Sequence, residues 1–186
     1  ADAPLARGGC TRRVDAPAQM RFAIRTATVD DADAASALVH ASFTALAVDP
    51  GDPSIMYTAV WSTDRAKAGG VFKSTDGGDT WHELSDLKNE SVRAIALDPN
   101  DSKILVAGTL KAVYRTTDAG ESWDRISPKG HADLINFHSI AIDPRDTNII
   151  YAGTTHLPWK TLDGGKSWHS IKEGIIDDSD IFSIAI

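Results

Sequence analysis

The chain has 186 residues, enough for one ordinary domain or two small ones, and its 42% hydrophobic and 24% charged residues are typical of a globular protein. Its 19 basic and 26 acidic residues give a net charge of −7. This balance argues against nucleic acid or an anionic membrane as a partner, because both select clustered Lys and Arg. No apolar run approaches the roughly 18 residues of a membrane span.

Residues 1–19 are predicted to be a flexible leader. The leader lacks the apolar stretch of a secretory signal, and the sequence does not predict a compartment. It contains Cys10, the only cysteine of the chain, so we expect neither an intramolecular disulfide nor a cysteine-based metal cage.

Residues 20–43 follow a plan of their own, a strand over RFAIRTAT and then a helix through ADAASALVHASF that Asp30 or Asp31 could cap. The segment resembles the first strand and helix of a GNAT acetyltransferase. The phosphate-cradling loop of that family does not follow in the sequence, so we do not expect acetyltransferase activity. The interpretation that remains is a fused leader whose helix packs on the edge of the next domain, or a chance similarity.

A repeat with the pattern Ser/Thr-x-Asp-Gly/Ala-Gly-x-Ser/Thr-Trp dominates the rest of the chain. In each copy, glycine supplies positive φ in a turn between antiparallel strands. The Asp and Ser/Thr side chains satisfy turn amides, and Trp covers the hairpin, so the motif is predicted to be structural. The predicted motif residues are Ser74, Asp76, Gly78, Trp81, Thr116, Asp118, Gly120, Trp123, Thr161, Asp163, Gly165 and Trp168.

A second motif accompanies the first, an alternating apolar strand that ends in Asp-Pro and is followed by another strand. Each period of 42 to 45 residues therefore holds about four short strands, which is typical of a β-propeller blade. We predict an all-β partial propeller over residues 44–186, with blades at 44–87, 91–129 and 138–172. Residues 181–186 (IFSIAI) are predicted to be the first strand of a fourth blade.

The repeats resemble the Asp-box (bacterial neuraminidase) repeats of sialidase-like and sortilin-like propellers and of photosystem-assembly-factor propellers. In that family the Asp boxes lie on the face away from the ligand site, which implies a structural role here. The resemblance identifies the repeat type and not the function, because enzymes and non-enzymes share it. A sialidase is not expected, since no arginine cluster can be assigned and the tyrosines fall in strands.

Three blades leave apolar faces uncovered, whereas closed propellers have four to eight blades. We therefore expect a homodimer in which two half-rings close a propeller, with residues 181–186 and possibly 21–28 completing a blade.

The loops at the end opposite the Asp boxes are the expected ligand-binding face. A propeller scaffold that binds a partner or small ligand there is the first functional hypothesis. The second is a hydrolase of esters, phosphoesters or glycosides, in which imidazoles and carboxylates hold a divalent metal. Scattered loop histidines with local hydrogen bonds are the simpler interpretation of the same residues. The candidate ligand-binding residues are Trp61, Asp64, His138, Trp159 and Asp178, and the candidate metal ligands are His131, His156, Asp133 and Asp180.

Overall fold

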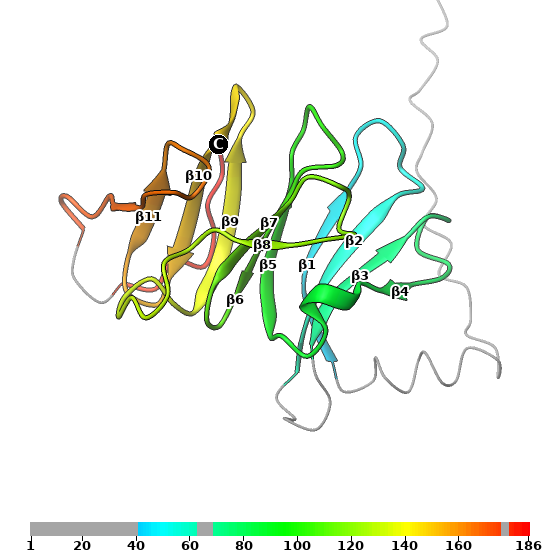
Figure 1. Cartoon of the computed structure of the whole chain (residues 1–186), viewed down its shortest axis with the longest axis horizontal. Coiled ribbons are helices and arrows are strands. Elements are labelled where there is room, and N and C mark those ends of the chain that lie inside the picture. The colour runs from blue at the N-terminus through cyan, green and yellow to red at the C-terminus, as the bar shows by residue number, and fades with distance from the viewer. Residues whose placement is uncertain (1–40, 63–68, 176–178) are drawn as a thin grey trace, which may run out of the picture.

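A computed structural model describes residues 41–62, 69–175 and 179–186. These residues form three four-stranded antiparallel sheets that stand side by side as three propeller blades (Figure 1). The all-β prediction is confirmed: the described part of the chain contains no α-helix, and therefore no helix long and apolar enough to cross a membrane.

In each blade the strands follow one another outward in chain order. Within the described residues, one short 3-10 helix, Ser85–Leu87, lies between the first two blades. Blade 1 consists of β1 (Ala41–Val48), β2 (Met56–Ser62), β3 (Gly70–Ser74) and β4 (His82–Glu83); blade 2 of β5 (Val92–Leu97), β6 (Leu105–Thr109), β7 (Val113–Thr116) and β8 (Asp124–Arg125); and blade 3 of β9 (Phe137–Asp143), β10 (Asp146–Thr154), β11 (Pro158–Thr161) and β12 (His169–Ser170).

Two predicted boundaries need correction. The first strand begins at Ala41, because residues 41–43 pair with β2, so the end of the helix predicted through residues 32–43 is a strand. The remainder of that segment and the leader lie outside the described residues. Residues 181–186, predicted to be a strand, form no β-ladder with the other described residues. They run beside blade 3, where the Ile181 amide donates to Thr154 O at 3.0 Å.

Neighbouring blades share apolar cores, and the innermost strands divide their side chains between them. In β5, Ala94 and Ala96 face the core shared with blade 3, while Ile95 and Leu97 face the core shared with blade 1. The small residues of β5 thus face the following blade, and its large aliphatic residues face the preceding one. Gly108 makes this close approach possible, since a Cβ there would lie 2.8 Å from Phe137 Cβ of blade 3.

The three Asp boxes have the same hydrogen-bond network. In blade 2, Thr116 Oγ1 donates to Asp118 Oδ1 at 2.6 Å and accepts from the Gly120 amide at 3.0 Å. Asp118 also accepts from the Ser122 amide and hydroxyl, at 2.9 and 2.6 Å. The turn glycine has a φ of 92°, which favours glycine. This network confirms that the motif is structural.

The tryptophan of the box closes the network in two ways. Trp81 Nε1 and Trp123 Nε1 donate to the carbonyl of their own turn glycine, each at 3.1 Å. Trp168 Nε1 instead donates to Ile126 O of the preceding blade at 2.9 Å. The third box therefore ties blade 3 to blade 2 as well as closing its own turn.

The turn motifs gather at one end of every blade, as predicted. The Asp-box amides of Gly77, Ala119 and Gly164 donate to carbonyls beside the Asp-Pro turns, at 2.8, 2.9 and 3.0 Å. At the opposite end, the loop between blades 2 and 3 is joined to the β6–β7 loop by a bond from the Asn136 amide to Leu110 O at 2.9 Å. The loops proposed to bind ligands therefore lie at the end away from the Asp boxes.

The first prediction concerns the Thr116 hydroxyl, which is buried and serves the buried Gly120 amide. We expect Thr116→Val to leave that amide without an acceptor and to lower the free energy of unfolding by about 1–3 kcal/mol. Urea denaturation measures the change. The matched control is Thr117→Val at the exposed neighbouring position, which should change stability by less than about 0.5 kcal/mol. Equal losses in both variants would contradict a role of the hydroxyl.

The second prediction follows from the Asp-box carboxyl groups. Hydrogen bonds from Thr80 and Ser122 lower the pKa of Asp76 and of Asp118 from 3.8 to about 2, and Ser167 likewise lowers that of Asp163. Because these pKa values are depressed in the folded state, the stabilisation is complete above pH 3.8 and is lost as pH falls through about 2. Urea midpoints measured between pH 5 and 2 should fall in this window, and Asp118→Asn should make the fall shallower. An unchanged slope in that variant would contradict the assignment.

Candidate axial pocket

The innermost strand of each blade carries a one-residue β-bulge at the same place. The ladder between the first two strands skips Thr44 in blade 1, Arg93 in blade 2 and His138 in blade 3. A bulge re-aims the side chain of the extra residue and increases the local twist. In the repeat pattern, Phe182 occupies the same position in IFSIAI, one residue before Ser183. The repeat therefore has four equivalent positions, and three of them, Arg93, His138 and Phe182, line one pocket.

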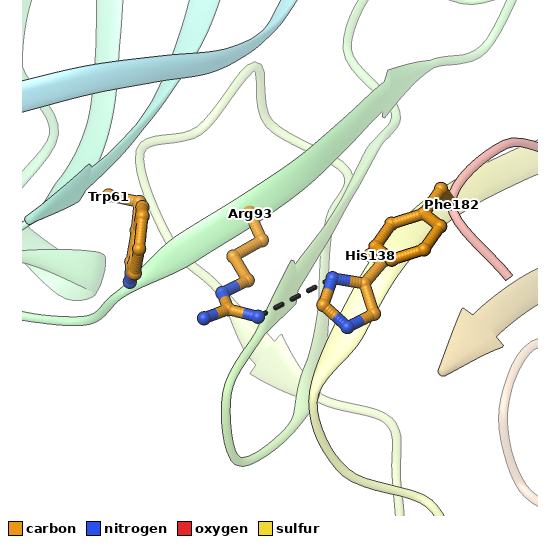
Figure 2. Close-up of a pocket in the computed structure, with 4 residues that line it drawn as sticks. All are labelled: Trp61, Arg93, His138 and Phe182. Carbon is orange, nitrogen blue, oxygen red and sulfur yellow. Dashed lines mark hydrogen bonds between the residues drawn. The ribbon is translucent and has the colours of Figure 1, made fainter. Parts of the chain in front are cut away.

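A pocket of about 280 Å³ lies between these positions, at the end of the molecule away from the Asp boxes. It is lined by Trp61 from β2, Arg93, His138 and Phe182 (Figure 2). An adjoining pocket of about 200 Å³ shares the last three residues and continues along the innermost strands toward Ser183 and Ile184. The two pockets together form an open groove along the inner surface of the blades.

Arg93 is held between two rings in this pocket. Its guanidinium carbon lies 4.7 Å from the centre of the Trp61 ring, and its Nη1 lies 3.4 Å from His138 Nδ1 (Figure 2). The imidazole also packs against Phe182, with ring centres 5.0 Å apart and the ring planes inclined at 50°. The stack fixes the guanidinium plane, because an arginine over an aromatic face gains cation–π attraction.

The polar atoms of the pocket are not fully satisfied. Arg93 Nε and His138 Nε2 are buried and have no hydrogen-bond partner among the described residues. The ion pairs in the described part of the chain join Lys88 to Glu83 and Arg145 to Asp143, and neither includes Arg93. An unpaired guanidinium with a buried donor attracts an anion, and a carboxylate matches its planar geometry.

Burial and neighbouring charge both act on the titratable groups of the pocket. Burial lowers the pKa of Arg93. The pKa of His138 is lowered from its ordinary value by burial first and by the Arg93 charge second, while Asp180 opposes this shift. His138 is thus held in its neutral form at pH 7, able to accept or donate one hydrogen bond according to its tautomer.

The structure brings together two of the five predicted ligand-binding residues, Trp61 and His138. Trp159 is 8% exposed and packs at the start of β11 in the core between blades 2 and 3, apart from Trp61 and His138. Asp64 and Asp178 lie outside the described residues.

Sequence reasoning missed Arg93 and Phe182, which line the pocket with Trp61 and His138. An alignment of the innermost strands would have revealed them, because both stand one residue before the small residue that opens each repeated strand.

The four predicted metal ligands do not form a cluster in the described residues, where no group of three or more His, Cys, Asp or Glu side chains could hold a metal. His131 Nδ1 accepts from the amides of Asp133 and Leu134, at 3.2 and 3.1 Å, and its ring meets Trp159 edge-on at 5.1 Å. It therefore closes its own loop, in agreement with the simpler interpretation of this histidine. The His156 amide donates to Thr154 Oγ1. Asp180 lies close enough to the axial pocket for its charge to raise the pKa of His138.

The third prediction tests the electrostatics of the pocket. Arg93→Met should raise the pKa of His138 because a nearby positive charge is removed, and Asp180→Asn should lower it further because a favourable negative charge is removed. NMR titration of the imidazole measures both shifts. Lys111→Met, which removes a cation at an exposed site outside the pocket lining, should leave the His138 pKa unchanged. Shifts of the same sign in the first two variants would contradict the geometry.

Comparisons with known proteins agree with the propeller fold. A xyloglucanase of Acetivibrio thermocellus is 32% identical over 94 residues, which cover 44% of this chain and 11% of the enzyme. The crystal structure of a GH74 enzyme from Niastella koreensis matches 69% of this chain and 22% of its own, at 24% identity and a TM-score of 0.56. A structure of YCF48 bound to D1 peptide matches 70% of this chain and 40% of its own, at 18% identity and a TM-score of 0.54.

The chain spans only about a tenth of the length of the curated xyloglucanases that it resembles, 9 to 11%. The model of the Sortilin-Vps10 family, described as "Sortilin, neurotensin receptor 3", matches residues 69–179, which is more than half of the chain. This match begins in blade 1 and extends beyond the last strand of blade 3. The chain therefore belongs to the Sortilin-Vps10 family of β-propeller repeat proteins.

Proposed function

We propose that this chain is a propeller binding module whose axial pocket takes up a carboxylate group together with an adjoining apolar side chain. The observation that carries the proposal is the Arg93 guanidinium, which is stacked on Trp61, partly desolvated and without a carboxylate partner in the described residues. A guanidinium in this setting gains most from a ligand that forms charge-assisted hydrogen bonds.

The surroundings of Arg93 favour a ligand that also has apolar surface. Trp61 is half-buried on one side of the guanidinium, and Phe182, which lies beyond His138 on the other side, is 67% exposed (Figure 2). Aromatic surface next to an arginine suits a ligand with a carboxylate at one end and a hydrocarbon or aromatic group at the other. The groove that continues along Ser183 and Ile184 gives room for an extended ligand, such as the end of a peptide.

The similar structure of YCF48 bound to D1 peptide supports a peptide as the ligand class, since that propeller is described with a peptide bound. The identity of 18% makes this a likeness of fold, so the argument for a carboxylate depends on Arg93 and not on the relative.

The fourth prediction uses a matched pair of small probes, N-acetyl-phenylalanine and its C-terminal amide. We expect the acid to shift the NMR signals of the Trp61 indole and the His138 ring, and the amide to bind at least about tenfold more weakly because it lacks the charge. Arg93→Met should abolish the preference for the acid, while Lys111→Met should retain it. Equal binding of acid and amide to the unaltered protein would refute the proposal.

A hydrolase is the second candidate, and the similarity to curated xyloglucanases favours it. Glycoside hydrolysis requires two carboxyl groups on either side of the scissile bond. The lining of the axial pocket contains none, so Asp64, Asp133 and Asp178 remain the acidic candidates from the sequence. Release of reducing ends from xyloglucan, lost in Asp64→Asn or Asp178→Asn but retained in Arg93→Met, would favour the hydrolase over the binding module.

A further inference from the structure

Phe182 exposes an aromatic ring to water at the point where the two parts of the axial groove meet. Its side chain lines both the pocket of about 280 Å³ and the adjoining pocket of about 200 Å³. At 67%, Phe182 has the highest exposure among the large apolar side chains of the described residues. Apolar surface gains free energy when it leaves water, so a ligand that covers this ring is favoured.

The backbone next to Phe182 is held by hydrogen bonds on both sides of Ile181. The Ile181 amide donates to Thr154 O, and the Ser139 hydroxyl donates to Ile181 O, each at 3.0 Å. Gly153 permits this close approach, because a Cβ at that residue would overlap Ile181 O. The backbone that carries the ring is therefore fixed against β9 and β10, although the ring itself is open to solvent.

The neighbours of the Phe182 ring favour an aromatic partner over a saturated one. Figure 2 shows Trp61, Arg93, His138 and Phe182 in one row, so that three aromatic rings and one guanidinium line the pocket. Aromatic rings attract one another in offset-stacked or edge-to-face arrangements, and this attraction adds to the free energy of burying apolar area. A saturated ring of similar size gains only the contribution from area.

The spacing between Arg93 and Phe182 suits a short ligand with a charge at one end and a ring at the other. His138 lies between the two residues: its Nδ1 is 3.4 Å from Arg93 Nη1, and its ring centre is 5.0 Å from that of Phe182. One imidazole ring thus separates the guanidinium from the phenyl ring. An acid with a few carbons between its carboxylate and an aromatic group can contact both.

We propose that the axial pocket selects aromatic carboxylates over aliphatic ones, and that Phe182 determines this selectivity. The inference rests on the proposed function, since Arg93 has to hold the carboxylate. Trp61 keeps the guanidinium in place from one side, and Phe182 contacts the aromatic ring of the ligand. The ligand class is an arylalkanoate, or a larger molecule that ends in the same group.

The test compares three probes on the full chain: 3-phenylpropanoate, 3-cyclohexylpropanoate and 3-phenylpropanamide. The two acids have the same charge at the same distance from the ring, and the cyclohexyl group has the larger apolar surface. Burial of area alone therefore favours the cyclohexyl acid, whereas contact between aromatic rings favours the phenyl acid. The two effects thus predict opposite orders of affinity.

NMR titration that follows the signals of the Trp61 indole and the His138 ring measures the three affinities. We expect 3-phenylpropanoate to bind about two- to tenfold more tightly than 3-cyclohexylpropanoate. Phe182→Leu keeps an apolar side chain but removes the ring, so it should abolish this preference. Since Phe182 is exposed, circular dichroism of the variant should match that of the unaltered protein.

The matched control is Phe72→Leu, which makes the same change at a partly buried phenylalanine of β3 outside the lining of both pockets. It should retain the preference for the phenyl acid. A preference that survives Phe182→Leu overturns the role of Phe182.

The amide separates this inference from the proposed function. If the unaltered protein binds the cyclohexyl acid as tightly as the phenyl acid or more tightly, and both acids more tightly than the amide, the aromatic selectivity is overturned and the carboxylate site stands. Equal binding of 3-phenylpropanoate and its amide, or no binding of either, refutes the proposed function and this inference with it.

Discussion

The contact between successive blades is the constraint on which the rest of the molecule depends. Each innermost strand turns small residues toward the following blade and large aliphatic residues toward the preceding one, so every interface packs a large side chain on a small one. Gly108 of blade 2 shows how tight the fit is, since a Cβ there would lie 2.8 Å from Phe137 Cβ and 3.1 Å from Ile140 Cγ1 of blade 3. Close packing of this kind fixes the distance between blades and therefore the position of the axis.

The Asp box and the axial bulge lie at opposite ends of a blade and have different roles. At one end, Ser or Thr, Asp and Gly satisfy the turn amides within the motif, and this chemistry repeats unchanged because it serves only the fold. At the other end, the bulged position differs in every blade, with Arg93 in blade 2 and His138 in blade 3. A position that is constant in backbone geometry and variable in side chain is where a repeat protein can acquire a specific site without altering its scaffold.

The sequence was sufficient to predict the blades and the structural role of the Asp boxes, because both arise from local patterns: strand alternation, turn residues and a motif at a regular period. For the candidate site, Trp61 and His138 stand out in the sequence as an aromatic and an imidazole at loop edges, and both line the axial pocket. The inward packing of Trp159 depends on the neighbouring blade, and the position of Arg93 depends on a bulge that no single strand reveals, so the sequence predicts neither. Convergence on an axis is a property of several blades together, and residues 93, 138 and 182 are far apart in sequence.

The neutral form of His138 links the arrangement of residues in the axial pocket to the binding of a ligand there. A protonated imidazole 3.4 Å from the Arg93 guanidinium would add a second positive charge in a partly buried site, and burial already disfavours it. A carboxylate that binds Arg93 would reverse part of this penalty, because a negative charge near the ring favours the protonated form. Ligand uptake and protonation of His138 should therefore assist each other, so that a carboxylate ligand raises the pKa of His138 and the ligand binds more tightly as pH falls toward that pKa.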